Sequence, residues 1–352
     1  MYSNRKVAIL GATGAVGQRF IQLLQGHPWF KIEVLAASER SAGKKYKAAC
    51  NWLLESNLPK ELAEIPVVHT DVESVEKAGS VDLVFSALPG DLAGPVENEF
   101  AALYPVFSKA SAHRMDNDVP LIIPEVNPDH AALIPVQKKL RGWKGFISTD
   151  PNCSTIQLAM TLKPLMQFGL KQVMVSTMQA LSGAGYPGVS SLDIIDNVVP
   201  FIAKEEDKLE CEPLKILGEF DGKRICAADF VLSSSCHRVN VRDGHLESVF
   251  VKLDSEPTVK DVEEAFSKFK GEPQKLKLPS APENPIVVLK EPNRPQPRLD
   301  RDKGKGMSVV VGRIRKDPIM TVKYLCLGHN TIRGAAGAGI LSAELMVTKG
   351  IA

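Results

Sequence analysis

The chain has 352 residues, of which 44% are hydrophobic and 6% aromatic, and this composition is typical of a globular protein with about two domains. Forty-three Lys and Arg residues against 41 Asp and Glu residues give a formal net charge of +2, which provides no strong attraction for nucleic acid or for an anionic membrane. We therefore expect a small-molecule partner and, because no leader pattern and no apolar run of roughly 18 residues is present, a cytoplasmic protein.

Short apolar runs alternate with helical patterns through the first 150 residues. In a parallel sheet each strand is followed by a crossover helix, so this alternation predicts a parallel sheet. The first helix is expected at residues 14–26. The expected strands are 6–10, 32–37, 81–88, 104–109 and 145–150.

Beyond about residue 151 the apolar runs become longer and more mixed, which favours an α+β domain built on a mixed sheet. Its expected strands are 171–180, 245–253 and 306–315. The proline-rich stretch 279–300 predicts an extended loop or arm, because proline fixes φ and lacks a backbone N–H. The small-residue-rich end of the chain predicts a helix without a strand partner, and we expect it to pack back on the first domain.

A glycine-rich loop follows the first expected strand. Gly11, Gly14 and Gly17 have the spacing GxxGxxG and stand between a strand and a helix. Glycines allow a tight turn and a close approach to a pyrophosphate, which the N–H groups at the helix start can bind. The spacing departs from the usual GxGxxG, so a tight turn without a ligand stays as an alternative.

The residues after the second expected strand bear on the choice of dinucleotide. A lone acidic residue there accepts from the ribose 2′-hydroxyl of NAD. This chain has Ser38, Arg40 and Ser41 instead, a set that suits a 2′-phosphate and favours NADP. Glu39 could still select NAD, and a solvated polar loop is the alternative without any ligand.

Cys153 stands at the expected start of a helix, after a polar turn at residues 150–152. The helix dipole and the free N–H groups there stabilise a thiolate and predict a lowered pKa, although by position alone a cysteine such as Cys153 is more often a small structural residue than a nucleophile. Most free cysteines are instead small buried residues, and we expect that of Cys50, Cys211, Cys226, Cys236 and Cys326. The Cys and His residues show no spacing for metal ligands or a disulfide framework, so no metal is expected.

A thiol that carries an acyl group needs a proton donor and acceptor nearby. Arg238 and His245 are seven residues apart and flank a glycine turn before an expected strand. A charged anchor followed by an acid/base at the mouth of a sheet is a plausible arrangement for this chemistry. Taken alone, the pair would be a weak indication.

Seven motifs in this order resemble those of aspartate-β-semialdehyde dehydrogenase, particularly its archaeal and fungal branch: GATGAVG, SAHRM, DPNCSTIQ, MQALSGAGYPG, EEDKLECEPLKIL, HRVNVRDGH and NTIRGAAG. The resemblance runs from about residue 5 to the C-terminus. It implies NADPH-dependent conversion of aspartyl phosphate to aspartate semialdehyde and phosphate, on the route to lysine, threonine, methionine and isoleucine. It also implies that Cys153 is the nucleophile, that His245 is the acid/base, and that Gln179 orients substrate near the thiol.

The resemblance extends to the residues that recognise the substrate. It makes Arg238 the bidentate partner of the α-carboxylate, Glu205 the partner of the amine and Lys208 a cation for the phosphate. Arg114 and Asn152 match the phosphate-binding pair. The register along the helix stays open, because Glu206 is adjacent and Glu212 and Lys215 repeat the spacing of Glu205 and Lys208.

Cofactor contacts are implied in the same way. The residues that match the pyrophosphate loop are Gly11, Thr13, Gly14, Ala15 and Val16, and those that match the 2′-phosphate contacts are Ser38, Arg40 and Ser41. Ser86, Leu88 and Pro89 resemble the adenine and ribose wall, and Ser182, Gly183 and Asn330 resemble nicotinamide contacts. Asn330 could equally cap the last helix, as Asn often does.

The sequence therefore predicts an α/β protein with two domains. Residues 1–150, completed by the C-terminal helix 331–352, form an expected Rossmann-like dinucleotide-binding domain, and residues 151–330 form an α+β catalytic and dimerisation domain with a mixed sheet. By resemblance the enzyme is a homodimer or homotetramer. Two alternatives remain, an N-acetyl-glutamyl-phosphate reductase with the same thiol chemistry and a non-catalytic dinucleotide-binding sensor.

Overall fold

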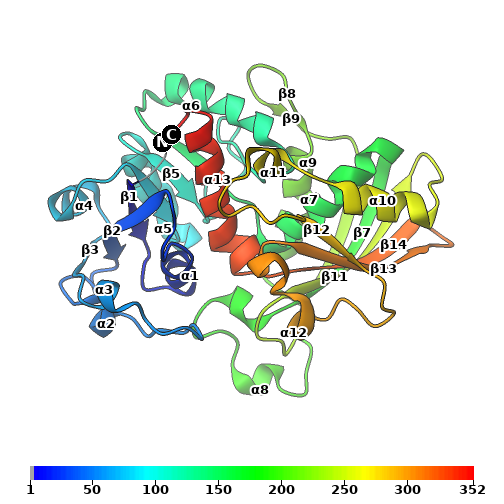
Figure 1. Cartoon of the computed structure of the whole chain (residues 1–352), viewed down its shortest axis with the longest axis horizontal. Coiled ribbons are helices and arrows are strands. Elements are labelled where there is room, and N and C mark those ends of the chain that lie inside the picture. The colour runs from blue at the N-terminus through cyan, green and yellow to red at the C-terminus, as the bar shows by residue number, and fades with distance from the viewer. Residues whose placement is uncertain (1–3) are drawn as a thin grey trace.

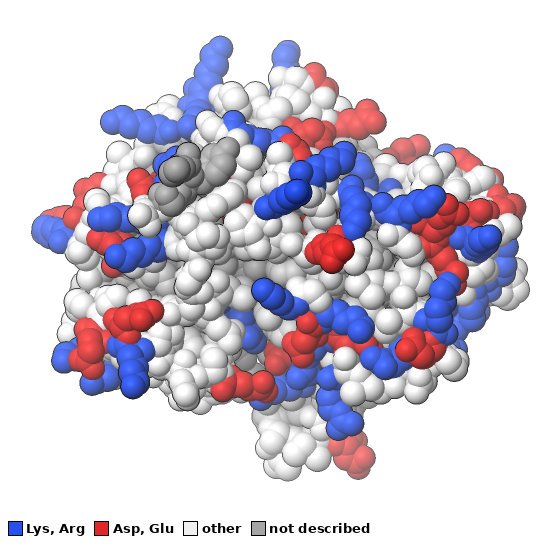
Figure 2. Space-filling model, in the orientation of Figure 1, with Lys and Arg blue, Asp and Glu red and all other residues white. Residues whose placement is uncertain are grey.

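Two six-stranded sheets organise the molecule, one in each half of the chain (Figure 1). The computed structural model describes residues 4–352, so residues 1–3 of the expected first domain lie outside the described part. In that part of the chain no helix has the length and apolarity needed to cross a membrane. On the face shown in Figure 2, Lys and Arg side chains are interspersed with Asp and Glu, without a wide area of one sign.

The first sheet has the strand order β3-β2-β1-β4-β5-β6, and all its neighbouring strands are parallel. This order is the doubly wound arrangement, in which ligands bind beyond the carboxyl ends of the strands. The parallel sheet predicted from the sequence is confirmed. Its strands are β1 (Arg5–Leu10), β2 (Phe30–Ala37), β3 (Val67–His69), β4 (Leu83–Ser86), β5 (Pro105–Ser108) and β6 (Phe146–Thr149).

Helices cover both faces of this sheet. They are α1 (Ala15–Leu23), α2 (Tyr46–Ala49), α3 (Lys60–Ala63), α4 (Val72–Ala78), α5 (Gly90–Ala101) and α6 (Leu133–Arg141). The C-terminal helix α13 (Gly337–Thr348) joins the core on the same face as α1, as predicted (Figure 1). Its small residues allow this packing, because a Cβ at Gly339 would lie 3.0 Å from the ring of Phe20.

The second sheet is mixed, as predicted, and has the order β10-β7-β11-β14-β13-β12. Its strands are β7 (Leu170–Gln179), β10 (Val231–Arg238), β11 (His245–Leu253), β12 (Ile286–Leu289), β13 (Val309–Lys316) and β14 (Val322–Gly328). The helices of this half are α7 (Cys153–Leu165), α8 (Ser191–Ile194), α9 (Glu205–Ile216), α10 (Val259–Lys268), α11 (Glu272–Leu276) and α12 (Pro297–Asp300). A short hairpin pairs β8 (Glu219–Phe220) with β9 (Ile225–Cys226).

The two faces of the second sheet differ. Residues that point to α7, α9 and α10 are buried in a single large apolar core. On the other face, alternate residues of β7 and β10 are exposed, and Met174 and Val231 have exposed fractions of 53% and 69%. An exposed apolar sheet face of this kind is typical of an interaction surface.

The expectation of an extended arm over residues 279–300 is wrong in part. Ile286–Leu289 form strand β12, which pairs in parallel with β13 at the edge of the sheet, and Pro297–Asp300 form helix α12. Edge strands tolerate flanking prolines because one row of their N–H groups needs no ladder partner. The apolar run IVVL was therefore a strand signal that the surrounding prolines concealed.

Candidate active site

The ends of several elements meet where the two sheets face each other. Cys153 is the first residue of α7, directly after β6, and His245 is the first residue of β11. Gln179 and Arg238 end the parallel strands β7 and β10, in which they are register partners. Residues that are far apart in the sequence are thereby brought to one end of the second sheet.

The thiol of Cys153 and the imidazole of His245 form the centre of this site. The Sγ atom of Cys153 lies 3.1 Å from Nε2 of His245. Nδ1 of His245 accepts a hydrogen bond from the backbone N–H of Ala180 at 3.0 Å, so the proton of the neutral ring sits on Nε2. His245 therefore presents an N–H donor to the sulfur and to any oxygen held beside it.

Burial controls the protonation of both groups. Desolvation raises the pKa of Cys153 to about 12, and the nearby carboxylate of Glu205 acts in the same direction, whereas Arg114 and Arg238 lower it. Desolvation also lowers the pKa of His245 to about 3, with a smaller contribution from the charge of Arg238. The predicted lowering of the thiol pKa is wrong here, because the loss of hydration outweighs the helix dipole.

Two glycines allow the backbone to approach the reacting groups closely. A Cβ at Gly183 would lie 2.8 Å from Nη1 of Arg238 and 3.0 Å from Cε1 of His245. A Cβ at Gly334, in the C-terminal segment, would lie 2.7 Å from Cβ of Cys153. Real Cβ atoms do not approach other atoms this closely, so any side chain at these two positions would displace the site.

Arg238 and Gln179 line the same end of the sheet, and both are buried. Nη1 of Arg238 donates to the carbonyl oxygen of Ala180 at 2.8 Å, which fixes the guanidinium beside the loop that also orients His245. Nε2 of Gln179 donates to Oγ1 of Thr177 at 3.3 Å. The structure thus brings both predicted residues to the thiol end of β7 and β10.

Helix α9 carries acidic residues in its first turn and a lysine in its last, which suits its macrodipole. Oε1 of Glu205 accepts from Nδ2 of Asn152 at 2.9 Å, and Oε2 lies 3.4 Å from Nζ of Lys208. Glu206 points elsewhere, because its Oε1 accepts from the backbone N–H of Cys236. Of these neighbouring registers, the structure brings Glu205 and Lys208 to the site.

Glu212 and Lys215 repeat the same spacing, but both are buried and their charged atoms form hydrogen bonds within the protein. Glu212 accepts from Nη1 of Arg114 and from the backbone N–H of Asn152. Lys215 donates to the carbonyl oxygens of residues 114, 116 and 119. The two pairs on α9 therefore have different surroundings, although their spacing is the same.

Arg114 and Asn152 lie together but use many of their donors within the protein. Nη2 of Arg114 donates to the carbonyl oxygen of Lys109 at 2.8 Å, and Nε is buried without a hydrogen-bond partner among the described residues. The side-chain oxygen of Asn152 caps α7 by accepting from the N–H groups of Ser154 and Thr155. An oxyanion here could be bound by the remaining N–H groups of Arg114 and of the Asn152 amide.

The glycine loop has the geometry of an anion site. Gly11 has φ of +74°, and a Cβ there would lie 2.7 Å from the carbonyl oxygen of Ala87. A Cβ at Gly17 would overlap the carbonyl oxygen of Gly11. Helix α1 begins after Gly14 with no side-chain cap and no acidic residue in its first turn, so its N–H groups at Ala15 and Val16, next to Thr13, can bind a phosphate.

The other predicted cofactor residues lie along the carboxyl ends of β2 and β4. Ser38 and Arg40 are exposed and Ser41 is half-buried, so the hydroxyls and the guanidinium are accessible. Leu88 and Pro89 precede α5 at the same edge of the sheet. Ser86 departs from its expected place on the adenine wall, because its side chain is fully buried and donates to Glu97 at 2.6 Å.

Asn330 links the C-terminal segment to the second half of the chain. Its Oδ1 accepts from the backbone N–H of Gly244 at 2.8 Å, and its Nδ2 donates to Oγ of Ser182 at 2.7 Å. The alternative interpretation as a helix cap is wrong, because the helical turn that follows starts after Thr331 and has no side-chain cap. A groove of about 300 Å³ runs beside this contact and is lined by Ala15, Arg19, Leu53, Ser182, Arg242 and Thr331.

The comparisons with known proteins agree with this geometry. Residues 6–134 match the family described as "Semialdehyde dehydrogenase, NAD binding domain", and residues 162–333 match "Semialdehyde dehydrogenase, dimerisation domain". The chain is 58% identical to the aspartate-semialdehyde dehydrogenase of Archaeoglobus fulgidus over 346 residues, which is 98% of each chain. The chain belongs to the aspartate-semialdehyde dehydrogenase family.

Two further relatives have a substrate and NADP in their names. A crystal structure of the Candida albicans aspartate semialdehyde dehydrogenase with NADP superposes with a TM-score of 0.90 at 43% identity, over 99% of this chain and 100% of that one. The malonyl CoA reductase (NADP) of Metallosphaera sedula is 45% identical over 99% of both chains. Similarity over the whole chain therefore does not distinguish a relative that acts on aspartate semialdehyde from one that acts on malonyl-CoA. The residues of the site must make that distinction.

Sequence reasoning missed two buried groups near Cys153. Glu212 was noted only as an alternative register, although it contacts both Arg114 and Asn152. Lys109 was not singled out, and its Nζ lies 3.1 Å from Oδ2 of Asp150, with both side chains buried. For Lys109 the available signal was a charged residue at the end of the expected apolar strand 104–109.

Proposed function

We propose that the protein catalyses the reversible, NADP-dependent conversion of L-aspartyl 4-phosphate to L-aspartate 4-semialdehyde and phosphate, as a step of amino-acid biosynthesis. The observation that carries the proposal is the 3.1 Å contact between the Cys153 thiol and a proton-bearing nitrogen of His245, with Glu205 and Arg238 acting electrostatically on the same sulfur. The printed names of the relatives from Archaeoglobus fulgidus and Candida albicans support it.

The charges of the site fit those of the substrate. Arg238 would pair with the α-carboxylate through its planar guanidinium, and Glu205 would pair with the α-ammonium group. Lys208, Arg114 and the Asn152 amide would contact the phosphate. Gln179, at the end of β7 next to Arg238, would hold the substrate chain over the thiol.

The chain's own residues account for the acyl transfer. Sγ of Cys153 attacks the acyl carbon, the bond to phosphate breaks with its electron pair remaining on the phosphate oxygen, and the departing phosphate takes up the proton of the thiol. NADPH, when bound, supplies the hydride that reduces the resulting thioester. The Nε2–H of His245 donates a hydrogen bond to the oxyanion that forms, and the thiohemiacetal anion collapses to the aldehyde as the C–S bond breaks with its electron pair on Sγ, which recovers a proton from solvent.

NADP is the proposed dinucleotide. Gly11 and the start of α1 would hold the pyrophosphate, and Arg40 with the hydroxyls of Ser38 and Ser41 would hold the 2′-phosphate. The groove that passes Ala15 and Ser182 would take the nicotinamide half, near Gly183 and Asn330. Leu88 and Pro89 would form the adenine and ribose wall. The relative from Candida albicans is described with NADP, which supports this choice over NAD.

Glu205 decides between the related substrates. The buried carboxylate of Glu205 needs a cationic partner, and an aspartyl substrate brings a free ammonium group to it. N-acetyl-glutamyl phosphate has an acylated nitrogen, and malonyl-CoA has none at this position, so both would leave Glu205 with Lys208, at 3.4 Å, as its cationic partner and the Asn152 amide as its neutral donor. The arrangement therefore favours the free amine.

A homodimer formed through the open face of the second sheet completes the proposal. This face presents Met174 and Val231 together with Ser233 and Ser235, and the region matches the family's dimerisation domain. Its apolar and small polar side chains suit a second copy of the chain better than a nucleic acid or a membrane. The six free cysteines suit the reducing cytoplasm.

The experiment compares substrates in the oxidative direction. Purified enzyme is given NADP+, phosphate and one of three compounds, L-aspartate 4-semialdehyde, N-acetyl-L-glutamate 5-semialdehyde or malonate semialdehyde with coenzyme A in place of phosphate. We expect phosphate-dependent NADPH formation with the first alone. Turnover of only the second or third would contradict the substrate assignment, and dinucleotide binding without turnover of any would favour the sensor.

A further inference from the structure

Helix α9 repeats the spacing Glu-x-x-Lys twice, and the two copies have different surroundings. In the first copy Lys208 is partly accessible, with a side-chain exposed fraction of 29%, whereas Glu205 is buried beside it. Glu212 and Lys215 in the second copy are buried, and their charged atoms all face the protein. The second copy cannot contact substrate in this arrangement, so its function must be sought in what it holds.

Glu212 holds the two halves of the proposed phosphate subsite with separate oxygen atoms. Its Oε1 accepts from Nη1 of Arg114 at 2.9 Å, and its Oε2 accepts from the backbone N–H of Asn152 at 2.7 Å. Glu212 has an exposed fraction of only 1%, so water competes little with either bond. One carboxylate therefore sets the distance between the guanidinium of Arg114 and the turn that precedes the nucleophile.

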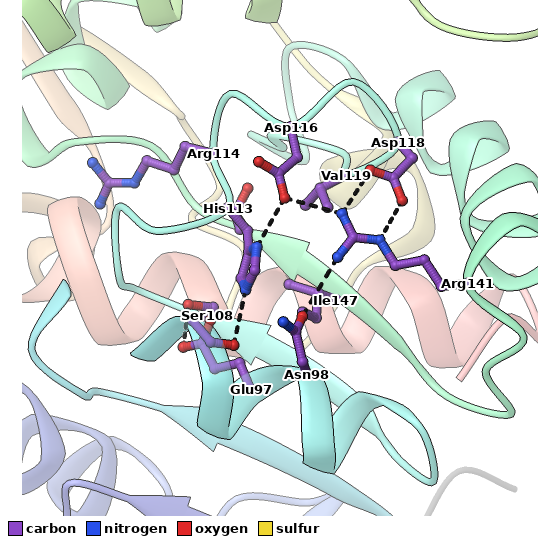
Figure 3. Close-up of polar contacts among 12 residues, drawn as sticks. Glu97, Asn98, Ser108, His113, Arg114, Asp116, Asp118, Val119, Arg141 and Ile147 are labelled. Atoms are coloured by element: carbon purple, nitrogen blue, oxygen red, sulfur yellow. Dashed lines mark hydrogen bonds and ion pairs between the residues drawn. The ribbon is translucent and has the colours of Figure 1, made fainter. Parts of the chain in front are cut away.

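The loop that carries Arg114 is fixed from two other directions as well. Nζ of Lys215 donates to the carbonyl oxygens of Arg114, Asp116 and Val119 at 2.7, 2.8 and 2.8 Å. Figure 3 shows Arg141 between Asp116 and Asp118, while Arg114 points away from this cluster. With the backbone of the loop held in this way, the direction of the Arg114 side chain is set by Glu212 at Nη1 and by the carbonyl oxygen of Lys109 at Nη2.

We infer that Glu212 is a positioning residue of the phosphate subsite, which aims Arg114 and the Asn152 turn at the same phosphate group. The inference rests on the proposed function, because it presumes that phosphate is the leaving group and the acceptor. A glutamine at position 212 has one acceptor oxygen and one NH2 group, so it would meet one of the two donors with another donor. Either Arg114 or the turn would then move.

The test separates the binding of phosphate from the binding of aldehyde. Glu212→Gln is compared with wild type and with Glu210→Gln, a matched change on the same helix whose carboxylate bonds the backbone N–H and hydroxyl of Ser234, away from the site. We expect the KM for phosphate to rise at least tenfold in Glu212→Gln, with the KM for aspartate semialdehyde changed less than threefold. In the absence of turnover, more phosphate should also be needed to protect Cys153 from a thiol reagent. Glu210→Gln should match wild type in both measurements.

Several outcomes would overturn the inference. An unchanged KM for phosphate would show that Glu212 does not position the subsite, and a lowered one would make it a counter-ion that competes with phosphate for Arg114. Equal rises in both KM values, or failure of both Glu212→Gln and Glu212→Asp to fold, would assign it a general structural role. If wild type shows no phosphate-dependent turnover and phosphate does not protect its thiol, the proposed function itself fails, which is a distinguishable result.

Discussion

The backbone N–H of Ala180 donates to Nδ1 of His245, and this bond determines which ring nitrogen faces Cys153. With Nδ1 occupied as an acceptor, the neutral ring carries its proton on Nε2, 3.1 Å from the sulfur. His245 is therefore poised as a hydrogen-bond donor to an oxyanion rather than as a base for the thiol proton. The loop that supplies Ala180 also supplies Gly183, which packs against the same ring.

Replacement of this hydrogen-bond donor should slow the reaction without removing Cys153. For His245→Asn we expect kcat to fall by about 10²- to 10³-fold, because the oxyanion loses the donor that Nε2–H places beside the sulfur. Cys153 should still react with a thiol reagent, as mass spectrometry of the labelled peptide can show. A rate equal to that of wild type would remove the role assigned to His245.

The acidity of the thiol gives a second prediction. Because burial raises the pKa of Cys153 to about 12, the free enzyme holds it as a thiol near neutral pH. The rate of alkylation should rise about tenfold per pH unit between about pH 7 and 9, since only the thiolate reacts. A rate that levels off near neutral pH would indicate a preformed thiolate and would contradict this assignment.

The geometry of Arg238 should matter more than its charge. Arg238→Lys keeps the charge but loses the planar fork that pairs with a carboxylate, so the KM for aspartate semialdehyde should rise by about tenfold or more. Steady-state kinetics at saturating phosphate measure this effect. Arg224→Lys, at an exposed position in the β8–β9 hairpin, is the matched control. An unchanged KM in Arg238→Lys would argue against the anchor.

A single methyl group at position 183 should disturb the site. In Gly183→Ala the new Cβ would press on Arg238 and His245, so kcat/KM should fall by about 10²-fold, the scale expected for a misplacement of about 1 Å. Gly94→Ala, where a Cβ would meet only Cβ of Ala112 at 3.8 Å, controls for the substitution itself. Equal kcat/KM values for the two variants would show that the close approach is unimportant.

Glu247 makes the stability of the fold depend on pH. Burial raises the pKa of this carboxyl to about 8 from an ordinary value of 4.5, so the native state binds its proton more tightly than the unfolded chain does. Its contribution is fully present below about pH 4.5 and declines by about 1.4 kcal/mol per unit as the pH rises to about 8. The difference between the thermal midpoints of Glu247→Gln and wild type should therefore change over this range, with the midpoint of the variant rising relative to that of wild type as the pH increases. Parallel profiles would refute this.

Much of the fold follows from local patterns in the sequence. The βα alternation of the first half and the buried helix α13 were predicted because their apolar periodicity is strong. Strand β10 was missed because three consecutive serines in VLSSSCHR, of which Ser233 and Ser235 face the open side of the sheet, interrupt the apolar pattern. Strand β3, with three residues, is too short to give a periodic signal.

The site was predicted in its members but not in its electrostatics. Cys153 and His245 could be named from motifs, whereas the thiol pKa depends on how completely Gly334 and the surrounding segments exclude water, which no local pattern encodes. The same limit applies to Glu212 and Lys215. Their spacing is that of Glu205 and Lys208, and only the packing of α9 against the loop at residues 114–119 distinguishes them.

The most direct test is a search for the acyl group on Cys153. The enzyme is mixed with aspartate semialdehyde and NADP+ without phosphate, and NADPH formation and intact mass are recorded. We predict a burst of about one NADPH per active site, together with an aspartyl adduct on the peptide that contains Cys153. Phosphate should then remove the adduct, and Cys153→Ser should show neither burst nor adduct. Phosphate-dependent turnover in Cys153→Ser, or an adduct on another residue, would contradict the account.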